Sequence, residues 1–114
     1  MLDVRFHVCP KCGNVIVSTG NAEVRCCGNI LPALHAEQGQ GMRMAPVNGE
    51  YVISVGRHPM TKDHYFAFYA AVSDDGVQLV RLFPGGKTEA RFRAEGVKRI
   101  YMYCTVHGLY YSDK

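Results

Sequence analysis

The sequence has no tryptophan and no long apolar run. Its 114 residues are 47% hydrophobic, enough for one modest core, but no stretch is long enough to span a bilayer. The first ten residues, MLDVRFHVCP, lack the basic region and apolar core of a secretory signal. We therefore expect a cytoplasmic protein without a membrane segment.

A strong excess of one charge is also missing. The chain has 13 basic and 10 acidic residues, for a net charge of +3, and no run of Lys or Arg that would follow a phosphate backbone. The sequence therefore predicts no nucleic-acid partner. Its five cysteines form a C-x-x-C pair, an adjacent pair and a single residue, an odd set that favours metal ligation in a reducing compartment over disulfides.

Short runs rich in Val, Ile, Tyr and Phe predict a mostly β protein. From about Pro46 onward these runs alternate with turn sequences at the spacing of an antiparallel sandwich. Residues 15–25 read as a hairpin around Gly20 and Asn21, a pair suited to a tight turn. Residues 31–46, with two glycines and two prolines, are expected to form a linker or loop.

The first thirty residues hold too few large apolar groups for a core of their own, so a metal would have to hold them together. Gly13 lets the CPKCGN turn fold back, and Gly28 makes it easier for the backbone to twist where the two adjacent cysteines must face one ion. Four thiolates suit either zinc or a single iron. A structural role and a redox role are equally open for this group, which comprises Cys9, Cys12, Cys26 and Cys27.

A second group of metal-binding residue types lies near the C-terminus. The segment HPMTKDH contributes His58 and His64, and CTVH contributes two more residues at the end of a predicted strand, Cys104 and His107. Three imidazoles and one thiolate form a mixed ligand set typical of a functional transition-metal site. The remaining histidines, His7 and His35, read as surface residues rather than ligands.

The motifs CPKCGN, CCG, HPMTKDHY and CTVHGLY together resemble those of desulfoferrodoxin, the two-centre superoxide reductase. The resemblance implies a desulforedoxin-like four-cysteine module over residues 1–36 and an immunoglobulin-like β-sandwich over residues 37–114. In that family the module binds iron through its four cysteines. A second iron, held by four equatorial histidines and an axial cysteine, reduces superoxide to hydrogen peroxide.

The same resemblance implies residue roles and partners. It assigns His58, His64 and His107 as equatorial ligands and Cys104 as the axial one. The family also implies a small electron donor such as rubredoxin, and a homodimer.

The sequence departs from the family in the loop that leads into the sandwich. Where the family has Glu-Lys-His, this chain has Met42, Arg43 and Met44, so one histidine ligand is replaced. Arg43 keeps a positive charge that can attract the superoxide anion. Met44 stands where the family has the histidine. Water, the thioether of Met44 or His35 would then complete the ligand set of the second metal. Thr105 replaces the family asparagine beside the cysteine.

Three functions are compatible with these features. The first is a superoxide reductase-like enzyme with iron at both sites, zinc being the alternative at the four cysteines, and with Arg43 and Cys104 in catalytic roles. The second is a non-enzymatic electron-transfer protein. The third is a structural or interaction domain with a degenerate second site, where iron is absent or replaced.

Overall fold

The computed structural model describes residues 1–39 and 42–114, and every regular element in this part of the chain is a β-strand. The predicted mostly β fold is therefore confirmed. Within the same ranges, the structure has no helix that is long and apolar enough to cross a membrane. The strands are β1 (Arg5–Val8), β2 (Val15–Ser18), β3 (Arg25–Cys26), β4 (Asn29–Ile30), β5 (Ala36–Gln38), β6 (Met42–Val47), β7 (Glu50–Val55), β8 (Phe66–Val72), β9 (Val77–Arg81), β10 (Glu89–Arg93), β11 (Arg99–Cys104) and β12 (Gly108–Asp113).

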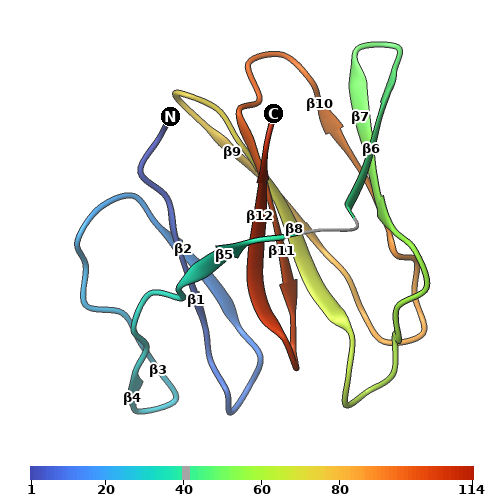
Figure 1. Ribbon diagram of the computed structural model, residues 1–114. Coiled ribbons are helices and arrows are strands. Elements are labelled where there is room, and N and C mark those ends of the chain that lie inside the picture. The colour runs from blue at the N-terminus through green and yellow to red at the C-terminus, as the bar shows by residue number, and fades with distance from the viewer. Residues whose placement is uncertain (40–41) are drawn as a thin grey trace.

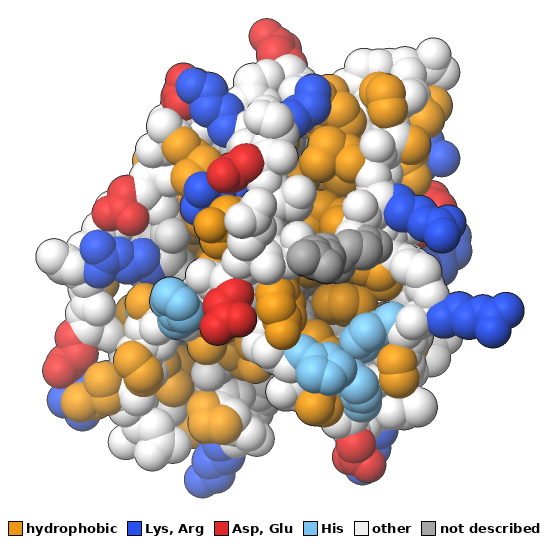
Figure 2. Space-filling view, viewed as in Figure 1, with side chains coloured by type: hydrophobic (Ala, Val, Ile, Leu, Met, Phe, Trp, Pro, Cys, Tyr) orange, Lys and Arg blue, Asp and Glu red, His pale blue; other side chains and the backbone are white. Residues whose placement is uncertain are grey.

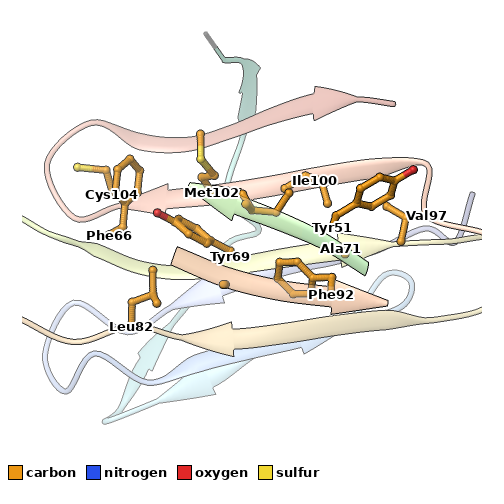
Figure 3. Close-up of a cluster of buried hydrophobic side chains, with 12 residues drawn as sticks. Tyr51, Phe66, Tyr69, Ala71, Leu82, Phe92, Val97, Ile100, Met102 and Cys104 are labelled. Atoms are coloured by element: carbon orange, nitrogen blue, oxygen red, sulfur yellow. The ribbon is translucent and has the colours of Figure 1, made fainter. Parts of the chain in front are cut away.

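The strands form three layers (Figure 1). A five-stranded sheet in the order β5-β12-β11-β8-β9 lies in the middle, with the three-stranded sheet β10-β7-β6 on one face and the β1-β2 hairpin on the other. Side chains of the two larger sheets meet in one buried cluster, in which Tyr51 and Phe92 pack with Tyr69 and Ile100 (Figure 3). The sandwich core therefore lies between these two sheets.

Strand β8, FAFYAAV, is buried along its whole length because both faces of the middle sheet are covered. Tyr69 and Ala71 point into the sandwich core, whereas Phe68 and Ala70 point to the opposite face. On that face Phe68 meets Phe6 of β1, with the two ring centroids 5.2 Å apart. The N-terminal hairpin therefore packs on the sandwich through a shared apolar layer.

A β-bulge interrupts the pairing of β8 with β11. Tyr103 pairs with Phe68, but the next residue, Cys104, pairs with Phe66, so Ala67 has no partner in the ladder. Because side chains alternate along a strand, the extra residue turns Phe66 to the sandwich-core face, where Cys104 also lies (Figure 3). The bulge therefore places an aromatic ring beside the buried thiol.

The predicted hairpin over residues 15–25 is wrong. Strand β2 pairs with β1 through the CPKC turn, in the register Phe6↔Val17, and β3 pairs with β4 instead. Val15 and Val17 thereby join Phe6 against the middle sheet. Burial of this apolar face outweighs the local turn preference of Gly20 and Asn21.

Residues 31–46 contain two strands, so the expectation of a linker or loop is also wrong there. Strand β5 pairs in parallel with β12 and forms the edge of the middle sheet, and β6 pairs with β7 along six residues. Strand β6 lies at the edge of its sheet. Pro46, which has no N–H, therefore costs the sheet no hydrogen bond. Residues 40 and 41 of this segment lie outside the described residues.

His7 is not a surface residue, contrary to the expectation from alternation. It is 2% exposed, and its ring nitrogens lie 2.9 Å from the Leu31 carbonyl oxygen and 2.9 Å from the Ser18 hydroxyl. The segment that contains Leu31 covers the outer face of the β1-β2 hairpin, so both faces of β1 are buried. This histidine ties three segments of the N-terminal region together.

Candidate metal centres

The first pair of cysteines lies on the turn between β1 and β2. The Gly13 N–H donates to the Cys9 carbonyl at 2.8 Å, and the Cys9 N–H donates to the Asn14 carbonyl at 2.9 Å. Gly13 has a φ of +75°, which only glycine adopts without strain. The turn therefore closes the hairpin and brings Cys9 and Cys12 to the same side.

The second pair lies on the turn between β3 and β4. Cys27 and Gly28 have φ values of +52° and +78°, the two successive positive angles of a tight hairpin turn. Adjacent residues of a regular strand would face opposite ways, so this turn is what lets Cys26 and Cys27 face one point. The twist that the sequence predicted at Gly28 is present, and it begins one residue earlier.

These two turns meet at the lower left of Figure 1 and form the four-cysteine cluster, Cys9, Cys12, Cys26 and Cys27. The Cys26 sulfur lies 3.6 Å from that of Cys12 and 3.9 Å from that of Cys27. Four sulfurs around one ion with bonds of about 2.3 Å lie about 3.8 Å apart, whereas a disulfide requires about 2.05 Å. The arrangement fits a tetrahedral thiolate site, and all four residues are free thiols.

The thiols of this cluster have very different proton affinities. A hydrogen bond from the backbone N–H of Cys12 lowers the pKa of the Cys9 thiol from 9.0 to about 7. Hydrogen bonds shared with the other sulfurs, first of all that of Cys12, raise the pKa of Cys27 to about 12. Binding of a cation must therefore displace protons from this cluster, which makes metal affinity depend on pH.

The second group lies at the lower right of Figure 1, where two loops of the sandwich meet. His58 and His64 belong to the connection from β7 to β8, and Cys104 and His107 flank the turn from β11 to β12. Thr105 joins the two loops, because its backbone N–H donates to the Tyr65 carbonyl at 3.0 Å and its hydroxyl accepts from the Tyr65 N–H at 3.2 Å.

The ligand-type atoms of these four residues converge. The Cys104 sulfur lies 3.4 Å from His58 Nε2 and 3.4 Å from His107 Nδ1, and all four groups lie within 4.8 Å of one another. A nitrogen and a sulfur on one ion lie about 3.1 to 3.6 Å apart, depending on the bond angle. We call this group the His/Cys cluster: His58, His64, Cys104 and His107.

Two features leave imidazole nitrogens free for a cation. His64 Nε2 is buried and, within the described residues, has no hydrogen-bond partner, an arrangement that a bound ion would resolve. His58 Nδ1 lies 2.7 Å from the Pro59 carbonyl oxygen, to which it can only donate, so Nε2 keeps its lone pair. Burial, followed by the neighbouring His58 and His107, holds the pKa of His64 below its ordinary value and favours the neutral ring.

The thiol is enclosed on its inner side. Cys104 is 1% exposed, and the Phe66 ring lies tilted against the His58 ring, with the two centroids 4.0 Å apart. Figure 2 shows a group of histidine side chains at the lower right of the surface, with hydrophobic side chains above it, Lys or Arg side chains to the right, and an Asp or Glu side chain below it. The cluster thus has an apolar inner wall and an open outer side.

A cavity of about 780 Å³ opens beside the His/Cys cluster. His58, Cys104 and His107 line it, together with the apolar side chains of Met42, Phe66 and Met102 and with Arg43. Among the described residues that line the cavity, none is Asp or Glu. An anion that enters this space meets a positive charge and no carboxylate.

The cavity lining also indicates which residue could take the place of the missing histidine ligand. Met42 belongs to the described lining and Met44 does not, although both side chains pack against the sandwich core. Met42 is therefore better placed than Met44 to offer a thioether, contrary to the expectation from the order of residues. His35 is exposed, as expected, and lies outside both groups of described ligand-type residues.

Comparisons with known proteins address the family. The desulfoferrodoxin family model matches residues 32–113, which is more than half of the chain. The chain belongs to the desulfoferrodoxin family. Two curated desulfoferrodoxins, from Clostridium acetobutylicum and Syntrophotalea carbinolica, are each 28% identical to it, and the alignments cover 97% and 96% of both partners. The resemblance seen in the sequence motifs is thereby confirmed.

The fold has a counterpart among solved structures. The superoxide reductase from Treponema pallidum superposes with a TM-score of 0.86, at 23% identity, over 99% of this chain and 100% of its own. At that identity the likeness establishes the fold alone. It agrees with the β layers described above.

The sequence alone does not reveal what three residues contribute near the His/Cys cluster. Phe66 reaches the cluster only through the bulge in β8, and Met42, which stands where the family has glutamate, lines the cavity. Thr105 was noted only as a departure from the family asparagine, although its hydroxyl joins the two ligand loops. Its position directly after Cys104 was the one available signal.

Proposed function

We propose that this protein is a superoxide reductase that converts superoxide to hydrogen peroxide at the His/Cys cluster. The observation that carries the proposal is the convergence of three imidazoles and one buried thiol beside a cavity lined by Arg43. Iron is the metal we assign to this cluster, because mixed imidazole and thiolate ligands suit it and the family does this chemistry with iron. When bound, that iron would supply the electron by which superoxide, with two protons, becomes hydrogen peroxide.

The chain's own residues have distinct roles in this proposal. His58, His64 and His107 would hold the ion as neutral ligands, and the Cys104 thiolate would donate electron density to it. Arg43 attracts the superoxide anion electrostatically through its guanidinium group. Phe66 keeps water from the inner face of the thiol.

The four-cysteine cluster is proposed to hold a second iron, with zinc as the alternative. Its sulfur spacing fits either ion, and either one would fold the N-terminal hairpins around itself. An iron there would accept single electrons, for which a small donor such as rubredoxin is the proposed partner. Residues 1–36 then form the four-cysteine module and residues 37–114 the sandwich domain. We further propose a cytoplasmic homodimer, since a module with so little core has reason to pack against a second copy.

One observation favours a second candidate. Met44 replaces the fourth histidine of the family, and the described lining of the cavity includes the thioether of Met42 instead. A thioether is a weak ligand for iron, so the His/Cys cluster could have lost its reactivity. The protein would then be an electron-transfer or structural protein that depends on the four-cysteine cluster.

The metals and the reaction can be tested together. We would measure iron and zinc per chain in protein made in iron-replete, anaerobic conditions, and then the peroxide formed from a superoxide pulse. The proposal expects two irons per chain, a second visible band at longer wavelength, and peroxide formation. Two irons without peroxide formation would refute the enzyme. One ion per chain, with only the thiolate-iron spectrum or none, would support the second candidate.

A further inference from the structure

We propose that Arg57 is a second anion-binding residue and that, with Arg43, it forms a two-guanidinium subsite for small monovalent anions in front of the His/Cys cluster. The inference deepens the proposed function and rests on it for the identity of the natural anion, superoxide. The subsite itself consists of side chains of this chain and needs no metal to exist.

The two arginines come from different segments but line the same cavity. Arg57 lies in the connection after β7, directly before His58, whose Nε2 faces the Cys104 sulfur. Arg43 lies on β6, where it pairs with Ser54 of β7. Pairing of these neighbouring strands therefore brings both guanidinium-bearing residues to one rim of the cavity.

Neither positive charge is neutralised by a neighbour. No ion pair found within residues 1–39 and 42–114 involves Arg43 or Arg57. Both residues are exposed, so their side chains can move toward an anion. The described lining holds no Asp or Glu, so no lining carboxylate opposes the two positive charges.

The walls of the cavity strengthen this effect. Met42, Phe66 and Met102 present apolar surface, which lowers the local dielectric and concentrates the field of the two charges. A monovalent anion is thus drawn toward the imidazole ligands. Because the cavity supplies no carboxylate that would compete for this space, small anions such as azide and chloride are expected to compete with superoxide.

The test uses iron-loaded, ferric protein and azide as the probe. Azide affinity is read from the change in the visible band of the His/Cys centre, for wild type, Arg43→Gln, Arg57→Gln and the double variant. The matched control is Arg93→Gln on β10, which removes the same charge from an exposed residue outside the described lining. We expect Arg57→Gln to weaken azide binding roughly three- to tenfold, the double variant to weaken it further, and the control to change it less than twofold.

Superoxide kinetics provide the link to function. In Arg57→Gln the second-order rate constant should fall severalfold and should depend less steeply on salt, because a steering charge has been removed. An effect on azide without peroxide formation in the wild type would refute the enzyme but support the subsite. An Arg57→Gln variant that behaves like Arg93→Gln in both measurements would overturn the subsite.

A second readout covers protein that does not take up iron at this cluster. Chlorine-35 NMR line broadening reports chloride exchange in zinc-loaded protein, where no redox chemistry occurs. The excess broadening should fall in Arg57→Gln and Arg43→Gln relative to Arg93→Gln. Equal broadening in all three variants would show that no subsite exists, whatever the metal content.

Discussion

The two groups of ligand-type residues are built in different ways. The four-cysteine cluster comes from two tight turns, and its members lie between residues 9 and 27. The His/Cys cluster comes from two loops of the sandwich, and its members lie between residues 58 and 107. The first arrangement depends on local backbone geometry at Gly13, Cys27 and Gly28, whereas the second depends on the packing of β7, β8, β11 and β12.

This difference predicts opposite couplings between metal and fold. The N-terminal hairpins have a small apolar face of their own, so their metal should contribute to folding. The sandwich has a buried core between two sheets and should fold whether or not the His/Cys cluster is occupied. Metal loss should therefore be a structural event at the first cluster and a functional event at the second.

Cys26→Ser should have the largest effect on structure. It removes one of four thiolates at the centre of the cluster, so we expect loss of the bound metal and local unfolding of the hairpins. Metal content and amide hydrogen exchange of residues 1–30 would measure both. The His/Cys cluster should keep its metal, although the melting temperature should fall, because Phe6 and Phe68 share an apolar layer. Unchanged metal content and stability would contradict the assignment of this cluster.

Cys104→Ser is the reciprocal change at the second cluster. A serine hydroxyl is a far weaker donor to iron than a thiolate, so the longer-wavelength band should disappear and peroxide formation should fall by about 100-fold or more. The spectrum of the four-cysteine cluster should persist, which makes this variant the control for Cys26→Ser. Retained peroxide formation would show that the reaction does not take place at the His/Cys cluster.

The next prediction concerns the replaced histidine. Met42→His places an imidazole on the cavity lining, so iron retention against a chelator and peroxide formation should both rise, by roughly tenfold for retention. Met44→His is the matched comparison and should gain less, because Met44 is not part of the described cavity lining. A larger gain from Met44→His would show that Met44, as the order of residues indicates, occupies the place of the family histidine. No gain from either substitution would mean that another group already fills the coordination position of the missing imidazole.

Thr105→Val should have the smallest effect. It removes the hydroxyl that accepts the Tyr65 N–H and so loosens the joint between the two ligand loops. We expect a loss of about 0.5 to 1.5 kcal/mol in unfolding free energy and a faster release of metal from the His/Cys cluster. Chemical denaturation and chelator kinetics would measure these, with Thr19→Val on an exposed residue as the control. Equal behaviour of the two variants would remove the proposed role of Thr105.

Much of the fold and of both clusters could be predicted, and the misses have physical causes. Strand-forming runs such as FAFYAAV and RIYMYC indicated a β protein, because their residue types favour extended backbone. The pairing of β2 with β1 was missed, since turn preference at Gly20 is weaker than burial of Phe6. Strands β5 and β6 were missed because their glycine- and proline-rich segment pairs only where neighbouring strands offer open edges.

By itself, the sequence determined the chemistry that is available. The C-x-x-C and adjacent cysteine pairs and the HPM and CTVH motifs identify the residue types that could bind metal, and short spacing limits how the cysteines can meet. Only the tertiary structure decided which side chains surround the second group. The bulge in β8 turns Phe66 toward Cys104, and the pairing of β6 with β7 carries Met42 and Arg43 to the cavity that Arg57 also lines. These placements depend on strand register, and register is set by burial of whole sheets rather than by any local run of residues.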